Sequence, residues 1–320
     1  MKAMIYTQYG SADVIRAAQM AQPTPKDNEV LIKIHAASIN SADYRLMHGQ
    51  PFMVRFVYGL FKPRHPILGS DIAGRIEAVG RAVTQFKVGD EVYGDLSNAG
   101  LGGFAEYVCA PESVIVRKPK SLSFEEAAAV PMAAITALQG VRDKGQVRVG
   151  QRVAINGASG GVGTFAVQIA KGLGAHVTAI CSTRNVEAVR ALGADDVIDY
   201  TQTDFTASGQ HYDAIVGVNG YHPLAHYKRA LTANGVYVMV GGSDAQIFQA
   251  LTGSILSKQV QSLMVKPNAA DLEYMTALLE SGKVRPIIER CYPLTELADA
   301  MRYVESGHAR GKVVMQVARA

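Results

Sequence analysis

The chain contains little cysteine, and its cysteines are far apart. Cys109, Cys181 and Cys291 are the only three among 320 residues, and none forms a C-x-x-C pair. A disulfide framework needs paired cysteines, and a structural zinc lobe needs four soft ligands at close spacing. The sequence therefore argues against both, and each cysteine is expected to be a small buried apolar residue.

Long apolar runs and blocks of basic residues are also missing. No run reaches the roughly 18 apolar residues of a membrane-spanning helix, and the opening MKAMIYTQYG is too polar for a signal or transit peptide. The formal charge of +4 comes from scattered Lys and Arg, which does not indicate a nucleic-acid or membrane surface. We therefore expect a soluble, cytoplasmic protein without nucleic-acid or membrane partners.

The composition is that of an ordinary globular protein, and the length suits two domains. In residues 1–122, short alternating runs such as VLIKIHAAS and FAEYVCA are separated by Gly, Pro, Asp and Asn. This pattern predicts a small, irregular antiparallel barrel with no long helix. At Ser121 the pattern changes, because Ser123 and Glu126 form a capping box before an Ala-rich helix. Pro131 starts a second helix or kinks the first.

From Gln151 onward, apolar strands and amphipathic helices alternate, which predicts a doubly wound parallel sheet covered by helices on both faces. The tail from about Asn268 carries two amphipathic helices, DLEYMTALLESG and LTELADAMRYVESG, and the strand GKVVMQV. These are too few elements to fold alone. We therefore expect one domain from residues 1–122 and 267–320, and a second from residues 123–266.

The strongest chemical motif is NGASGGVG, residues 156–163, between the strand RVAI and an apolar-periodic helix. Its glycines allow a tight turn, close approach of a pyrophosphate and close strand–helix packing, with the phosphates on the helix N-terminus. A glycine triad alone also suits a turn without a ligand, but the surrounding βα units favour a dinucleotide. The expected contacts are Gly157, Ser159, Gly160, Gly161, Val162 and Gly163.

An acidic residue is missing where an NAD site would place one, at the end of the second strand. Residues 164–186 contain no Asp or Glu, and the strand ends in CSTRN. Ser182 and Arg184 instead suit the 2′-phosphate of NADPH, although Arg184 could also be a solvated charge at a helix start. Tyr200 is expected on the adenine side, and Asn219 and Gly241 near the nicotinamide, because both end strands.

Several stretches together carry a family resemblance: SINSADYRLMHG, HPILGSDIAGRIEAVG, FKVGDEVYG, GGFAEYV, NGASGGVG, LGADDVIDY and SGHARGKVV. As a set they resemble the medium-chain dehydrogenase/reductase superfamily, and most closely its zinc-independent quinone oxidoreductase and enone reductase branch. The resemblance implies an α/β protein with a GroES-like irregular β-barrel catalytic domain and a Rossmann domain for NADPH. It also implies a homodimer and adds Thr136 and Lys312 to the cofactor contacts.

Zinc ligands are missing where the zinc alcohol dehydrogenases of this superfamily hold their catalytic metal. By the closest alignment, those positions are Asn40, Ser70 (followed by Asp71) and Met132, so no catalytic metal is expected. Without a Lewis acid, oxidation of a simple alcohol is disfavoured. Hydride transfer to a quinone or an α,β-unsaturated carbonyl remains, because hydrogen-bond donors can stabilise the charge that develops on oxygen.

The candidate catalytic donors are Asn40, Tyr44 and Arg45, with Thr136 on the helix before the cradle. Related reductases often carry a tyrosine two residues after the Asp of SINSAD. Here that position is Arg45 and the tyrosine is its neighbour Tyr44, so a tyrosine proton donor cannot be transferred directly. Asn40 and Asp43 could also serve only as turn and backbone caps.

Residues 50–66 mix aromatic and basic side chains, and they suit a loop over the substrate mouth about as well as a plain surface loop with a partly buried aromatic cluster. His222 and His226 stand four apart on an expected helix. Without a nearby carboxylate in the sequence, they are interpreted as exposed residues rather than metal ligands.

Two other functions remain as alternatives. The chain could be a non-catalytic NADPH-binding sensor or structural relative that kept the cradle and lost turnover. A methyltransferase that uses S-adenosylmethionine would want an acidic residue at the end of the second strand, and CSTRN lacks it.

Overall fold

The computed structural model describes residues 1–218, 222–242, 249, 253–254 and 257–318. The chain divides into two compact units, each described by itself below. Unit 1 comprises Met1–Met132, Pro267–Ser281 and Pro286–Ala320, and unit 2 comprises Ala133–Lys266 and Gly282–Arg285. Unit 2 is therefore inserted into the sequence of unit 1.

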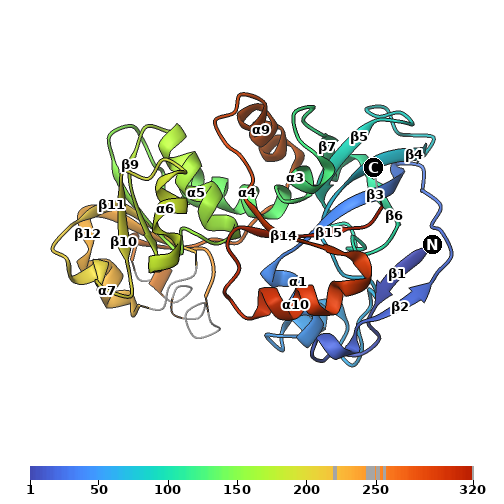
Figure 1. The fold of residues 1–320 in the computed structure, drawn as a ribbon, viewed down its shortest axis with the longest axis horizontal. Coiled ribbons are helices and arrows are strands. Elements are labelled where there is room, and N and C mark those ends of the chain that lie inside the picture. Colours follow the sequence, from blue (N-terminus) through green and yellow to red (C-terminus); the bar gives the residue numbers. More distant parts are fainter. Residues whose placement is uncertain (219–221, 243–248, 250–252, 255–256, 319–320) are drawn as a thin grey trace. The chain divides into compact units, whose positions relative to one another are not determined.

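Unit 1 is built on a largely antiparallel sheet with β3 near its middle (Figure 1). Strand β3 pairs antiparallel with β4, β6 and β15, while β14 and β15 run parallel to each other. In spatial order the strands are β14 (Ile288–Pro293), β15 (Lys312–Gln316), β3 (Glu29–Ile39), β4 (Asp71–Val79), β5 (Glu91–Asp95) and β7 (Ile115–Arg117), with β6 (Tyr107–Pro111) on β3 and a separate pair, β1 (Lys2–Ile5) and β2 (Arg16–Gln19).

The first part of unit 1 contains a helix that the sequence pattern did not predict. Helix α1 (Ser41–His48) begins after Asn40, whose backbone N–H donates to the Asp43 carboxylate at 2.7 Å. It ends at Gly49, which takes the left-handed conformation at φ +64°. A short helix, α2 (Val54–Tyr58), follows within residues 50–66. Both helices are short, and the sequence pattern, which predicted no long helix before residue 122, indicated neither of them.

The capping box at Ser123 is confirmed. The Ser123 N–H donates to Glu126 at 2.8 Å, the Glu126 N–H donates to the Ser123 hydroxyl at 3.1 Å, and helix α3 (Phe124–Ala128) follows. Since α3 packs against β3 and β4, unit 1 extends past residue 122 to Met132. Pro131 begins the next helix, α4 (Pro131–Leu138).

The C-terminal tail completes unit 1. It supplies α9 (Ala269–Glu280), β14, α10 (Leu297–Glu305) and β15, and α10 lies beside α1 (Figure 1). His48 on α1 and Glu305 on α10 are joined at 2.8 Å. Met301 on α10 is fully buried in the same core as Ile32 and Ile72 of the central strands. Short 3-10 turns also occur at Ala12–Val14, Glu112–Val114 and Leu294–Glu296.

Unit 2 confirms the expected doubly wound parallel sheet. Every pairing is parallel, and the spatial order is β10 (Asp196–Asp199), β9 (His176–Cys181), β8 (Arg152–Asn156), β11 (Tyr212–Gly217), β12 (Leu231–Met239) and β13 (Val260–Ser262). The described connections are η3 (Gln139–Lys144), α5 (Gly161–Gly172), η4 (Thr183–Asn185), α6 (Val186–Arg190), η5 (Phe205–Ala207) and α7 (Leu224–Arg229). The strand order reverses between β8 and β11, because the strands after β8 are added first on one side of it and then on the other. Ligands bind α/β sheets at such switch points.

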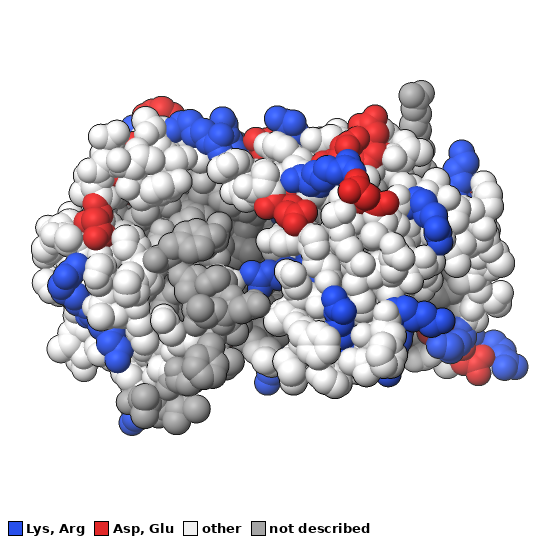
Figure 2. All heavy atoms as spheres, turned by 90° about the horizontal axis from the view of Figure 1, so that it is seen from below, with Lys and Arg blue, Asp and Glu red and all other residues white. Residues whose placement is uncertain are grey.

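The surface agrees with the scattered charge of the sequence. On the face in Figure 2, Lys and Arg side chains lie dispersed among uncharged and acidic ones. None of the described helices combines the length and the apolar character needed to cross a bilayer.

Candidate functional site

The glycine cradle of unit 2 joins β8 to α5. Gly157 follows the strand at φ +88°, a conformation that favours glycine. A Cβ on Gly163 would lie 2.1 Å from the Gly157 carbonyl oxygen, so close packing of helix on turn requires a glycine there. A Cβ on Gly160, by contrast, would meet nothing nearer than 3.7 Å. The chain's own packing therefore leaves open space beside Gly160.

This open space lies at the N-terminus of a 12-residue helix with no acidic residue in its first turn. The first N–H groups of any helix lack intrahelical acceptors and carry a partial positive charge, so they bind anions well. Ser159, Gly161 and Val162 are partly exposed at this turn. The cradle therefore fits the diphosphate of a dinucleotide.

A side chain that the sequence analysis missed connects the cradle to the loop after β9. Asn185 is 4% exposed, and its amide nitrogen donates to the hydroxyls of Ser159 at 3.0 Å and Ser182 at 3.1 Å. Its carbonyl oxygen is buried without a hydrogen-bond partner among the described residues. Such an orphaned acceptor beside an anion cradle suits a bound group with a hydroxyl donor.

Arg184 lies exposed in η4, next to the partly buried Ser182. The same loop also contacts an acidic residue that the sequence analysis did not consider. The Thr183 hydroxyl donates to Asp199 at the end of β10, and this bond, together with bonds from Thr201, holds the pKa of Asp199 below its usual value. Tyr200 is next in the chain and 59% exposed.

The remaining cofactor candidates in unit 2 lie at different places. Gly241 follows β12, and its N–H donates to the carbonyl of Gly217 at the end of β11 at 3.4 Å, so these two strand ends are adjacent. Thr136 is 6% exposed on α4. Asn219 lies outside the described residues.

In unit 1, two of the three positions aligned with zinc ligands, Asn40 and Met132, meet at one buried carboxylate. Asp71 is fully buried and accepts from the Asn40 amide at 2.9 Å and from the Met132 backbone N–H at 2.9 Å. The Asn40 amide also reaches the Ser70 hydroxyl at 3.4 Å. The Asn40 side chain therefore takes part in this cluster.

Lys312 supplies the cationic member of the same cluster. Its Nζ, 4% exposed as a residue, donates to Asn40 Oδ1 at 2.5 Å and to the carbonyl of Ile39 at 3.2 Å. The Asp71 carboxylate lies 3.5 Å away. The ammonium therefore fixes which end of the Asn40 amide faces Asp71, and it neutralises that carboxylate.

Two further buried carboxylates belong to this region. Asp43 caps α1 and also accepts from the Gly69 N–H at 3.2 Å. These contacts match the interpretation of Asp43 as a turn and backbone cap. Burial raises the pKa of Asp43 to about 7. Burial, helped by the neighbouring Asp71, raises the pKa of Asp95 to about 6, and one oxygen of Asp95 has no hydrogen-bond partner among the described residues.

The other catalytic candidates are on α1. Tyr44 and Arg45 are half-buried, and Tyr44 packs against the core of unit 1. Residues 50–66 expose most of their apolar side chains, including Met53 at 69% and Phe61 at 90%. The aromatic residues at 52, 56 and 61 are therefore exposed rather than partly buried, and the role of this segment as a substrate loop stays a prediction.

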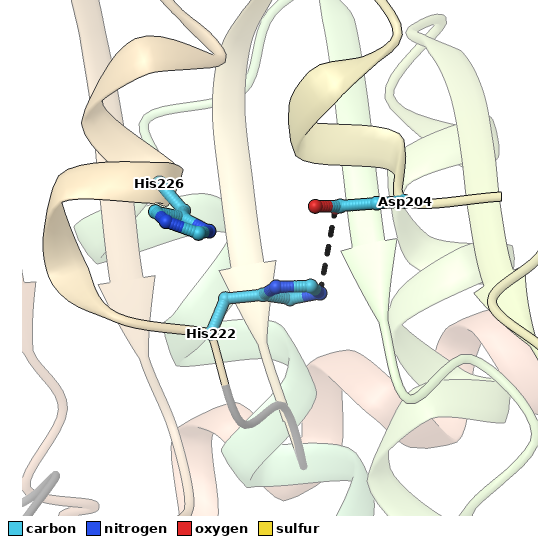
Figure 3. A group of neighbouring side chains, drawn as sticks. All are labelled: Asp204, His222 and His226. Atoms are coloured by element: carbon cyan, nitrogen blue, oxygen red, sulfur yellow. Dashed lines mark ion pairs between the residues drawn. The ribbon is translucent and has the colours of Figure 1, made fainter.

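The interpretation of His222 and His226 as exposed residues without a carboxylate partner is wrong. Both are half-buried, and Asp204, from the loop after β10, lies beside them (Figure 3). His222 precedes α7 rather than standing on it. The carboxylate comes from a separate part of the sequence, so local spacing gave no sign of it.

Comparisons with known proteins cover nearly the whole chain. The model of the alcohol dehydrogenase GroES-like domain matches residues 26–120, and that of the zinc-binding dehydrogenases matches residues 192–315. The chain is 37% identical to a chloroplast envelope quinone oxidoreductase homolog of Arabidopsis thaliana (99% of this chain, 98% of that protein) and 36% identical to 2-methylene-furan-3-one reductase of Solanum lycopersicum (98% and 79%). The solved quinone oxidoreductase of Coxiella burnetii matches with a TM-score of 0.90 and 32% identity over 99% of both chains.

Proposed function

Since the chain belongs to the quinone oxidoreductase and enone reductase branch of the medium-chain dehydrogenase/reductase superfamily, we propose that it reduces quinones or α,β-unsaturated carbonyls with NADPH and without zinc. Membership makes it an NAD(P)H oxidoreductase with a GroES-like domain and a Rossmann domain. The preference for NADPH, the acceptor and the independence from metal are the proposal.

The observation that carries the proposal is the cluster around Asp71. An amide, a hydroxyl and a thioether stand at the family's metal positions. The Asn40 amide and the backbone N–H of Met132 donate to the Asp71 carboxylate, which is paired with Lys312, and the Ser70 hydroxyl is in contact with the Asn40 amide. These groups are not the ligand set that zinc uses, so the residues do not fit a catalytic zinc. They do offer hydrogen-bond donors, which is what a substrate oxygen needs when it gains charge.

The cradle supports a dinucleotide, and Arg184 supports NADPH. When bound, NADPH supplies a hydride from C4 of its nicotinamide to an electron-poor carbon of the acceptor. The open backbone beside Gly160 and the N-terminus of α5 would hold the diphosphate. The Arg184 guanidinium would pair with the 2′-phosphate through charge-assisted hydrogen bonds.

Asn40 is the donor best placed to act on a substrate oxygen. One of its amide N–H groups is held by Asp71 at 2.9 Å, while the contact to Ser70 is long at 3.4 Å. A substrate oxygen can take over that weak second contact at little cost. Lys312, bound to the amide oxygen, holds the amide in this orientation and is therefore a positioning residue.

A panel of quinones, enals and enones, followed by NADPH absorbance, tests the reaction class. We expect turnover with at least one member of the panel, unchanged after treatment with a strong chelator. An NADPH complex that is stable to every electrophile would instead support the non-catalytic alternative. Faster oxidation of simple alcohols by NADP⁺, or turnover lost with the metal, would overturn the proposal.

Asn40→Ala tests the proposed donor, with the exposed Asn28→Ala of the same unit as the matched control. Loss of one oxyanion donor lowers turnover by roughly 10²- to 10³-fold. We expect kcat/KM to fall by that order in Asn40→Ala, with NADPH affinity unchanged, and to stay at the wild-type value in Asn28→Ala. Equal kcat/KM in Asn40→Ala and wild type would exclude Asn40 as a donor.

Tyr44→Phe tests the proton donor. Only an enone product must gain a proton on carbon, because a reduced quinone takes its protons on oxygen. If Tyr44 supplies that proton, its loss slows enone reduction more than quinone reduction. An equal effect on both substrates would assign the tyrosine to packing alone.

The proposal includes a homodimer. In the described part of unit 2, strand β13 lies at the edge of the sheet and pairs only with β12. An edge strand of this kind can pair with its copy across a two-fold axis. Sedimentation at several concentrations would show twice the chain mass if this holds.

A further inference from the structure

Two imidazoles and one carboxylate from separate segments of the chain converge in unit 2. Asp204 follows β10, His222 follows β11, and His226 lies on α7. One ligand atom from each side chain lies within 4.8 Å of the others, and the three groups face a common space (Figure 3). His222 Nε2 is 3.8 Å from Asp204 Oδ1.

The contacts around these three residues are those that a metal site needs. The Thr206 backbone N–H and hydroxyl donate to the Asp204 carboxylate at 2.9 and 2.7 Å, which fixes its orientation. The His222 ring packs edge-on against Phe205 and Tyr227. Hydrogen bonds to ligating carboxylates and packing around ligating rings hold metal ligands in place in known sites.

His226 provides an independent sign of a missing partner. Its Nδ1 is buried and has no hydrogen-bond partner among the described residues. Its ring lies 6.1 Å from that of His222, with an interplanar angle of 33°. A buried polar atom without a partner is costly, and a ligand that accepts its lone pair removes this cost.

We propose that Asp204, His222 and His226 bind one divalent transition metal ion of the zinc class. Two imidazole nitrogens with one carboxylate oxygen favour such ions over Mg²⁺ and Ca²⁺, which prefer oxygen ligands alone. Ligand atoms around a tetrahedral zinc are about 3.4 Å apart. Rotations of the two imidazoles can therefore close the site without moving the sheet, and water would take the fourth position.

The bound ion would have a structural effect. It would tie the start of α7 and the segment after β11 to the loop after β10. This site shares no residue with the Asp71 cluster of unit 1, so it neither requires nor implies a catalytic zinc. It can fail without affecting the proposed reductase activity, and the reverse is also true.

Calorimetric titration of the full-length, metal-stripped protein with Zn²⁺ tests the site, with Mg²⁺ as the hard-cation control. We expect one Zn²⁺ per chain and no heat from Mg²⁺. Removal of a ligand weakens binding more than the 10- to 100-fold typical of its hydrogen-bonding neighbours, so His226→Ala and His222→Ala should lose roughly 100-fold or more. The exposed His211→Ala, in the same unit, is the matched control and should bind as the wild type does.

Asp204→Asn keeps an oxygen for Thr206 but removes the ligand charge, and it should also weaken Zn²⁺ binding. The visible spectrum of the Co²⁺-loaded protein gives a readout independent of affinity, and it should show nitrogen and oxygen coordination. A thiolate charge-transfer band would show that a cysteine binds the ion, and it would overturn the proposal. So would a wild type that binds no Zn²⁺, or binding that survives both histidine substitutions.

Discussion

At the scale of single residues, unit 1 buries three carboxylates close to one ammonium. Asp43, Asp71 and Asp95 are each 3% exposed or less, while Lys312 is the cation in direct contact with Asp71. Removing one partner of a buried ion pair costs about 3–5 kcal/mol, because the other charge stays uncompensated. This part of the chain therefore combines the proposed chemistry with strong constraints on folding.

Stability should fall as the pH rises from about 4 to about 7. Burial raises the pKa of Asp43 from 3.8 to about 7 and that of Asp95 from 3.8 to about 6. In this window the folded protein keeps protons that the unfolded chain releases. The stabilisation is therefore complete below the pKa of the carboxyl in the unfolded chain, and it is lost as the pH rises through the pKa in the folded protein. For Asp43 the loss is up to about 4 kcal/mol.

Urea unfolding across this pH range measures the effect. Asp43→Asn should reduce the decrease in the free energy of unfolding in the upper part of this pH range. The control Asp27→Asn, at an exposed position, should leave the decrease unchanged. Carboxyls whose pKa is lowered, such as Asp195, act in the opposite direction, but only below about pH 4. A free energy of unfolding that does not change between pH 4 and 7 would contradict the prediction.

Cofactor preference should depend on two residues of opposite charge, Arg184 in η4 and Asp199 at the end of β10. Charge-assisted bonds to a phosphate are worth about 1.5 to 3 kcal/mol, so Arg184→Ala should weaken NADPH binding by roughly 10- to 150-fold and leave NADH binding nearly unchanged. Asp199, bonded to the adjacent Thr183, brings a negative charge to the same loop, so Asp199→Asn should tighten NADPH binding. Titration of both cofactors into the variants is the measurement. Equal affinities of the wild type for NADPH and NADH would reject the assignment.

At the scale of elements, the features that the sequence predicted have a local cause. The turn from β8 to α5 can be predicted from the sequence, because backbone geometry requires a glycine at both Gly157 and Gly163, which are only a few residues apart. The cap at Ser123 can also be predicted, because its contact with Glu126 is local in the sequence. Helix α1 was missed because it has only eight residues and directly follows strand β3, and its cap depends on a carboxylate that also reaches the distant Gly69.

Contacts between residues that only the tertiary fold brings together could not be predicted from the sequence. Lys312 and Asp71 are 241 residues apart, and Thr183 and Asp199 pair only because β9 and β10 are neighbours in the sheet. The same is true of Asp204 and His222, which lie on the loops after two separate strands. Periodicity and spacing describe neighbours along the chain, so they carry no information on such contacts.

Two glycines of α5 should respond in opposite ways to alanine. In Gly163→Ala, the new Cβ would meet the Gly157 carbonyl oxygen at 2.1 Å, so the turn must shift and both stability and NADPH affinity should fall. In Gly172→Ala nothing lies within 4 Å, and the helix should gain about 0.5–1 kcal/mol. Thermal unfolding and cofactor titration compare the pair. Equal effects at both positions would show that the cradle does not depend on the contact of Gly163.

At the scale of the whole molecule, the two units have separate apolar cores. Tyr212, Tyr227 and Tyr237 belong to the core of unit 2, whereas Met47 and Phe104 belong to that of unit 1. A ligand held mainly by one unit stabilises that unit against opening, by about 2.7 kcal/mol at a concentration of 100 times its Kd. The response to NADPH should therefore be uneven along the chain.

Hydrogen exchange with and without NADPH measures this unevenness. The largest slowing is expected at the start of α5 and in residues 182–185, with a smaller change in β3 and β4. Slowing of equal size in the peptides of both units would indicate that the cofactor is not held mainly by the cradle. No slowing anywhere would remove the nucleotide from the proposal.

The insertion of unit 2 into unit 1 has a consequence for synthesis on the ribosome. Strand β15 pairs with residues 36–39 of β3, but Lys312 and Ile39 are 273 residues apart in the chain. At about 5–20 residues per second, this edge of β3 emerges roughly 14 to 55 s before its partner strand is translated. Unit 2, nearly all of it continuous from Ala133 to Lys266, can fold within that interval. Until then the nascent chain presents an unpaired strand edge, the kind of surface that chaperones must shield from other nascent chains.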